Sequence, residues 1–215
     1  MPPLRRELPC NGGDELMPKS TLVLAALVAG VGCSSKDSKA ADTAAAMPTP
    51  AVSAMKDSMP AMGAMPGMAM TGDADRDFLR MMSDHHKGMI EMAHMNKDRK
   101  GGGASVADAK KIDAKQDVEL DQMVTMLEKT YKDPYAPKVM ADNQAMADAL
   151  KSKTGADYDR AFYEDVITHH GQAITMVDEY LAKAKSPAVK QMAEKIKADQ
   201  AREIAEFQKK LDKMK

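Results

Sequence analysis

The chain has 215 residues, of which 44% are hydrophobic and 4% aromatic, and its formal net charge is −1 at pH 7. Such a chain can bury one modest core, and a net charge near zero argues against nucleic acid as a partner. The composition has no tryptophan and 21 methionines, and it favours helices because the aromatic residues that strands prefer are scarce.

The first 33 residues form a leader. From Met17 to Cys33 the chain has the anatomy of a secretory signal, with a cation at Lys19, an apolar run and small residues. The run is roughly eleven residues long against the ~20 that span a bilayer, so we expect it to be cleaved. We also expect translation to begin at Met17, because residues 1–16 resemble neither a signal nor a domain.

The small residues that end on Cys33 resemble a bacterial lipoprotein signal, in which Cys33 is lipidated and becomes the first residue of the mature protein. Ordinary secretion with a spare cysteine is the alternative. In the lipoprotein case the mature chain keeps no cysteine for a disulfide. A soft metal ion outside the cytoplasm must then be held by methionine and histidine.

Residues 34–72 have the composition of a flexible tether. They are mostly Ala, Ser, Thr, Pro, Gly and Met with almost no branched aliphatic residue, so they cannot bury enough surface to offset the entropy of ordering. Clustered thioethers on such a segment suit Cu(I) or Ag(I), although an incidental bias in composition explains them equally well. The methionines concerned are Met59, Met62, Met65, Met68 and Met70.

An internal repeat organises residues 73–215. Shifting the chain by 84 residues aligns 73–127 with 157–211 without a gap, and sixteen positions are identical, which indicates a duplication. We define the two copies as residues 73–131 and 157–214, joined by a connector at 132–156.

Each copy predicts two helices. In the first, apolar residues recur at helical spacing over 74–98 and 105–130, and a run of three glycines at 101–103 separates the two stretches. In the second, the break is at Ser186-Pro187, where serine caps the next helix and proline occupies its first turn. Two helical hairpins, a short connecting helix and no strand signal predict an all-α, ferritin-like four-helix bundle.

A polar layer should cross the middle of this bundle. His85 lies at the centre of the apolar face of its helix, His86 lies at the edge, and Gln116 is central to the facing helix. His85 and Gln116 are each roughly 23 Å from the turn at about 1.5 Å per residue, so they share one level. We therefore expect metal donors at His85, His86, Met89, Met92, His169, His170 and Met176, oriented by Gln116, Glu119, Gln200 and Glu203.

The segments DRDFLRMMSDHHKGMIEMA and DRAFYEDVITHHGQAITMV, followed by QDVEL and QAREI, resemble the bacterial family known as domain of unknown function 305. That resemblance implies a ferritin-like four-helix bundle, exported or anchored to a membrane, with some members connected to copper. The family pattern corresponds to the HH pair, the following methionine and the Q-x-x-E of each copy. Met89 departs from the small residue that the pattern leads us to expect, and it adds a sulfur atom beside the first histidine pair.

These features predict a copper-binding protein outside the cytoplasm, anchored by lipid, that sequesters Cu(I) or passes it to other copper-handling proteins of the envelope, with no catalytic constellation. The first copy should bind soft metal better, because Ala173 replaces Met89 in the second. Two alternatives remain open. One is a ferritin-like di-metal oxidase, which normally uses Glu-x-x-His motifs that the histidine-bearing helices lack, and the other is a structural or interaction module whose histidines only pack and sense pH.

Overall fold

The computed structural model describes residues 69–99 and 103–215, and within these it is all-α, as predicted. The predicted leader with Cys33 and the predicted tether up to Met68 lie outside the described residues. No helix in the described part of the chain is long and apolar enough to cross a membrane. The helices are α1 (Ala74–Lys97), α2 (Val106–Tyr131), α3 (Ala141–Lys151), α4 (Gly155–Leu181) and α5 (Pro187–Asp212).

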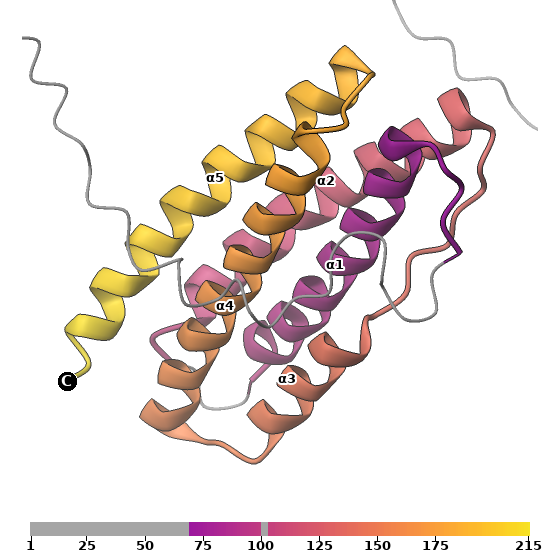
Figure 1. The fold of residues 1–215 in the computed structure, drawn as a ribbon. Coiled ribbons are helices and arrows are strands. Elements are labelled where there is room, and N and C mark those ends of the chain that lie inside the picture. The colour runs from indigo at the N-terminus through magenta and orange to yellow at the C-terminus, as the bar shows by residue number, and fades with distance from the viewer. Residues whose placement is uncertain (1–68, 100–102) are drawn as a thin grey trace, which may run out of the picture. The chain divides into compact units, whose positions relative to one another are not determined.

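The long helices form two antiparallel hairpins, α1 with α2 and α4 with α5, which are joined mainly by packing of α1 against α4 (Figure 1). The connector forms α3, which packs against α1 and α4. By contrast, α2 and α5 make few direct contacts with each other. The central pair α1 and α4 therefore holds the core, and these are the two helices that carry the histidine pairs.

Capping side chains mark the first turns of α1 and α5. The Asp73 side chain accepts hydrogen bonds from the backbone N–H groups of Asp75 and Arg76, which otherwise have no partner in the first turn of α1. Ser186 caps α5 in the same way, with Pro187 in the first turn. The predicted break at Ser186-Pro187 is therefore confirmed.

Two aspartates that match in the repeat hold the hairpins in register. Asp75 on α1 accepts hydrogen bonds from the Tyr180 hydroxyl at 2.6 Å and from backbone N–H groups at the turn of the α4–α5 hairpin. Asp159 on α4 accepts from the Ser105 hydroxyl at 2.6 Å and from backbone N–H groups at the turn of the α1–α2 hairpin. Each hairpin thus binds the turn of the other, and this reciprocal contact sets their relative height.

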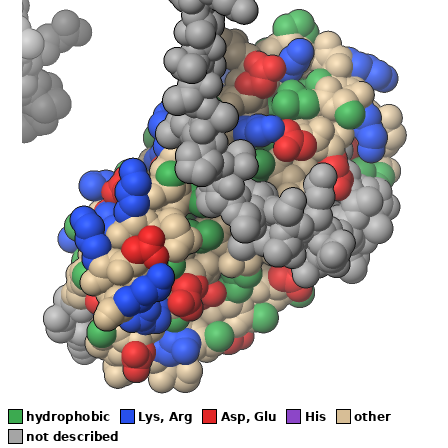
Figure 2. Space-filling model, turned by 60° about the vertical axis from the view of Figure 1, so that its left-hand side comes forward, with side chains coloured by type: hydrophobic (Ala, Val, Ile, Leu, Met, Phe, Trp, Pro, Cys, Tyr) green, Lys and Arg blue, Asp and Glu red, His purple; other side chains and the backbone are tan. Residues whose placement is uncertain are grey.

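Two apolar clusters lie on either side of the histidine pairs. One contains Phe78 and Tyr180, whose rings stack at 4.2 Å between centroids. The other contains Phe162, Tyr163 and Phe207. Basic and acidic side chains alternate over the face shown in Figure 2, in agreement with a net charge near zero.

Gly88 allows α3 to approach α1. A Cβ atom at this position would lie 2.2 Å from Nδ2 of Asn143 on α3, so no larger residue fits without a displacement. Asn143 is buried, and its Nδ2 donates to the carbonyl oxygen of His85 at 3.4 Å. The connector is therefore fastened to the backbone of the histidine segment.

Candidate metal centre

The four paired histidines meet in one buried layer, each with at most 1% of its surface exposed. The ring centroids of His85 on α1 and His169 on α4 are 3.7 Å apart, with planes tilted by 38°. His86 and His170 lie at the same level, because α1 and α4 carry them at matching positions of the repeat. The expectation that both copies place their histidines inside the bundle at one depth is confirmed.

Hydrogen bonds fix which nitrogen of three rings carries the proton. Nε2 of His86 lies 3.2 Å from Oε2 of Glu119, and Nε2 of His170 lies 2.7 Å from Oε2 of Glu203. Nε2 of His169 lies 3.1 Å from the carbonyl oxygen of His85. Because all three partners are acceptors, the proton belongs on Nε2, and in the neutral ring the lone pair is on Nδ1.

The Nδ1 atoms of all four rings are buried without a hydrogen-bond partner. In His85, Nε2 also lacks a hydrogen bond of normal geometry, although Gln172 is close enough to oppose part of the shift in its pKa. Buried polar atoms normally have a partner, and each one left alone needs an explanation. A neutral imidazole nitrogen with a free lone pair is the atom by which histidine binds a metal ion.

Burial keeps the rings of His85, His169 and His170 uncharged. Desolvation, followed by the positive charge that His86 and His170 would carry, lowers the pKa of His85 to about 3. Desolvation also lowers the pKa of His169 well below its ordinary value, and it lowers that of His170 although Glu203 opposes the change. The lone pairs are thus available at neutral pH without the removal of a proton.

Two lysines tie the carboxylates of the layer across the α2–α5 face. Nζ of Lys195 on α5 lies 3.0 Å from Oε1 of Glu119 on α2, and Nζ of Lys115 on α2 lies 2.7 Å from Oε1 of Glu203 on α5. Burial raises the pKa of each glutamate, but the histidine and lysine partners outweigh it, so both pKa values are lowered. Both glutamates therefore stay ionised and orient His86 and His170.

The two glutamines behave differently from the sequence expectation. Gln116 and Gln200 are buried, with 2% and 1% exposed, but neither the amide nitrogen nor the amide oxygen of either side chain has a hydrogen-bond partner. They therefore do not orient the imidazoles in this conformation. Of the four predicted orienting residues, the structure brings Glu119 and Glu203 against histidines and leaves both amides without a partner.

The predicted methionine donors are buried on both sides of the layer. Met89 and Met92 belong to the apolar cluster that contains Phe162, and Met176 belongs to the one that contains Phe78. In the tether, Met70 is described and is 40% exposed. The other predicted tether donors lie outside the described residues, namely Met59, Met62, Met65 and Met68.

The donor set of the layer suits a soft ion. In the described residues, no three histidine, aspartate or glutamate side chains of the layer bring their ligand atoms within 4.8 Å of one another. Neutral imidazole nitrogens are ligands that Cu(I) accepts. The unpartnered Nδ1 atoms of the layer therefore fit such an ion.

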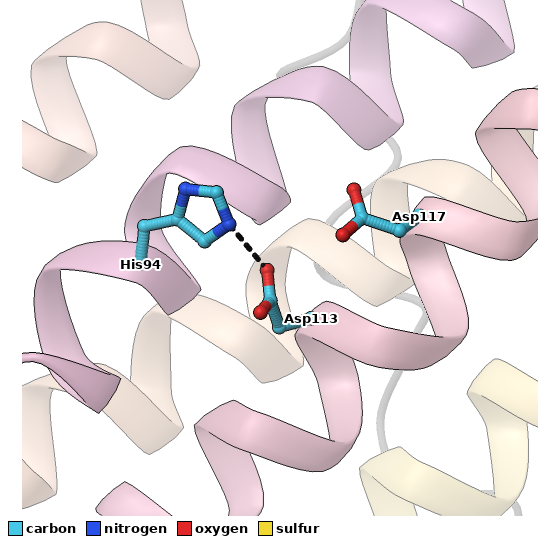
Figure 3. A group of neighbouring side chains, drawn as sticks. All are labelled: His94, Asp113 and Asp117. Carbon is cyan, nitrogen blue, oxygen red and sulfur yellow. Dashed lines mark ion pairs between the residues drawn. The ribbon is translucent and has the colours of Figure 1, made fainter. Parts of the chain in front are cut away.

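One group of three does satisfy that distance in the described residues, namely His94, Asp113 and Asp117, which point toward one another in Figure 3. The sequence interpretation missed this group. The signal was present, because a histidine near the end of one helix and two aspartates one turn apart on the next face each other across a hairpin.

The model of the family described as "Domain of unknown function (DUF305)" matches residues 32–127 and 75–211. A DUF305 fragment from Deinococcus radiodurans is similar in structure, with 22% identity, a TM-score of 0.58, and coverage of 65% of this chain and 96% of that one. CopM in its Cu(II)-bound form gives 25% identity and a TM-score of 0.57, with coverage of 66% and 97%.

A DUF305 protein from Streptomyces coelicolor, described as secreted, gives 21% identity and a TM-score of 0.58, with coverage of 66% and 94%. Comparison with curated proteins gives no match. The matched segments take in both histidine pairs and both Q-x-x-E segments. With its duplicated hairpins and buried histidine layer, this chain belongs to the DUF305 family.

Proposed function

We propose that this protein binds copper, chiefly as Cu(I), outside the cytoplasm and either stores it or passes it to other copper-handling proteins of the envelope. The observation that supports this best is the set of buried imidazole Nδ1 atoms that have lone pairs and no partner. A purely structural layer would satisfy these atoms, because each buried polar group without a partner costs about 1–3 kcal/mol.

The electronic state of the layer favours a soft ion of low charge. With neutral imidazoles and thioethers as donors, the site adds no negative charge of its own to the metal. Glu119 and Glu203 hold the Nε2 protons of His86 and His170, and hydrogen bonds of this kind fix a ring and raise its basicity as a ligand. The structural similarity to CopM, whose structure contains bound Cu(II), supports copper as the metal.

Anchoring and delivery are further parts of the proposal. A lipid on Cys33 would hold the protein at a membrane, and residues 34–72 would connect the anchor to the bundle. Methionines of this segment would collect Cu(I) at low affinity and raise its local concentration near the layer, as a tethered second binding site does.

The test is a Cu(I) titration of the full chain against a chromophoric chelator. Replacing Met59, Met62, Met65, Met68 and Met70 with Leu removes the thioethers of the tether and leaves the bundle intact. In that background we expect one class of Cu(I) site to remain. Replacing Met89 and Met92 with Leu should then weaken it by at least about tenfold, while the swap keeps core volume and costs less than about 1.5 kcal/mol of stability.

A matched control is Met123→Leu, which changes a buried methionine of α2 outside the predicted donor set and should leave Cu(I) affinity unchanged. Replacing His85 and His86 with Ala should abolish the remaining site, provided that circular dichroism shows a folded helical protein. A ligand that binds the folded state must raise stability. If the Cu(I) affinity, and the rise in melting temperature on adding Cu(I), are the same in this variant as in the protein with both histidines, the layer is a structural network and the proposal is wrong.

A further inference from the structure

The group of His94, Asp113 and Asp117 lies on the first hairpin, away from the buried layer. His94 is in the last turn of α1, and the aspartates are one turn apart on α2. Their ligand atoms lie within 4.8 Å of one another, and the three side chains converge in Figure 3. The His94 side chain is 40% exposed and that of Asp113 is 11% exposed, so the group combines a buried carboxylate with an imidazole that is open to solvent.

The second copy shows what a simple ion pair looks like at these positions. There the repeat places Asp178 opposite Lys197, which form an ion pair, and the residue that corresponds to Asp117 is Ala201. In the first copy, Lys97 already pairs with Oδ2 of Asp113. Lys97 and Asp113 thus already form an ion pair between α1 and α2. His94 and Asp117 are not needed for that ion pair.

The ion pair with Lys97 leaves the second carboxylate oxygen of Asp113 without a hydrogen bond. Oδ1 is buried and has no hydrogen bond of normal geometry, although Nε2 of His94 is 2.7 Å away. A carboxylate oxygen and an imidazole nitrogen at this distance repel if both present lone pairs. Either a hydrogen on Nε2 or a metal cation must therefore lie between the two atoms.

We infer that His94, Asp113 and Asp117 form a second metal site, specific for divalent cations of the Zn(II), Cu(II) and Ni(II) class. One imidazole nitrogen and two carboxylate oxygens match the preference of these borderline ions, with water in the remaining positions. The set contains no sulfur, so it discriminates against Cu(I). The site is independent of the buried layer and stands or falls separately from the proposed copper function.

The experiment is a Zn(II) titration of the full chain, followed through the imidazole resonances of its five histidines by ¹H–¹⁵N correlation NMR. Zn(II) is diamagnetic and binds thioethers weakly, so the methionines of the tether do not interfere. The resonances of His94 should shift first and saturate at one Zn(II) per chain. If the His94 resonances do not move while another histidine shifts, or if none moves, the inference is overturned.

The second copy supplies the control variant. The triple change His94→Asp, Asp113→Lys and Asp117→Ala installs the ion pair of the second copy on the first hairpin, so it removes the ligands and preserves a contact that the fold already tolerates. We expect loss of one Zn(II) equivalent. Should this variant not fold, His94→Gln removes the ligating nitrogen alone and should weaken Zn(II) binding by at least about tenfold.

The variant Lys97→Ala distinguishes between a metal site and a network of ion pairs. If Lys97 competes with the metal for Asp113, its removal should tighten Zn(II) binding, whereas a purely structural ion pair predicts no gain. A variant of the layer, His86→Ala/His170→Ala, should keep the His94 shift and its affinity. Unchanged Zn(II) stoichiometry in a folded triple variant would contradict the proposed site.

Discussion

The two hairpins descend from one sequence, and they agree in the interior far more than on the surface. Both place an imidazole against a glutamate, His86 with Glu119 and His170 with Glu203. Away from the layer they diverge, and the first hairpin has Met89 and His94 where the second has Ala173 and Asp178. The buried pairs of imidazole and carboxylate are thus the feature that both copies share.

The layer itself is not fully symmetric. Glu119 is 5% exposed, whereas Glu203 is 20% exposed. Lys195 reaches Glu119, but the lysine that reaches Glu203 is Lys115, and not Lys111, which matches Lys195 in the repeat. The same pattern of motifs therefore gives one dry pair and one pair that is open to water.

The largest expected effect concerns this difference. His86→Ala leaves Glu119 buried without its imidazole, and we expect the free energy of unfolding to fall by about 3–5 kcal/mol, as for other broken buried pairs. His170→Ala should cost roughly 1–3 kcal/mol, because water can hydrate Glu203. Urea denaturation of both variants measures the difference, and equal losses would show that the two pairs are equivalent.

Acid should weaken both copies together. The pKa of His85 is lowered to about 3 in the folded protein, so the unfolded chain, with its ordinary pKa near 6.5, binds more protons between these values. Stability is therefore lost as the pH falls below about 6.5, by roughly 2 kcal/mol at pH 5 for His85. His169 shifts in the same direction. Denaturation at a series of pH values from 7.5 to 5 measures how steeply the free energy of unfolding changes with pH. The variant His85→Asn should show a smaller pH dependence, and an unchanged pH dependence would contradict the role given to His85.

A steric contact unique to the first hairpin should give the next effect. Gly88→Ala forces the new methyl group against Asn143, and we expect a loss of about 1–3 kcal/mol, as in other overpacked sites. The double variant Gly88→Ala/Asn143→Ala removes the obstacle and should recover part of the loss. If thermal unfolding shows no such recovery, α3 is not seated on Gly88.

The smallest effect belongs to the lysine ties across α2 and α5. Lys195→Ala and Lys115→Ala should each lower the free energy of unfolding by less than about 1 kcal/mol, because exposed ion pairs are weak, and added salt should shrink the loss. Of the two, Lys195→Ala should cost more, since its partner Glu119 is the drier carboxylate. Chemical denaturation at low and high salt checks both the order and the salt effect.

Much of the fold was predictable because it depends on local rules. Helical spacing of apolar residues placed the long helices, and Ser186-Pro187 marked the start of α5. The duplication placed His85 and His169 at one depth, where their rings lie in contact with tilted planes. Hydrogen-bond partners within the layer were harder to predict from the sequence. Gln116 and Gln200 were expected to orient imidazoles, but their side chains form no hydrogen bond.

The sequence by itself determined the helices, their pairing into duplicated hairpins and the level at which the histidines meet, because periodicity and repeat spacing act along each helix. Only the tertiary structure decided which carboxylate meets which ring, that Lys115 crosses to Glu203, and that His94 faces Asp113 and Asp117. These contacts depend on the rotation and offset of one helix against another. A shift of an ångström changes a hydrogen-bond partner but leaves the apolar pattern of either helix as it was.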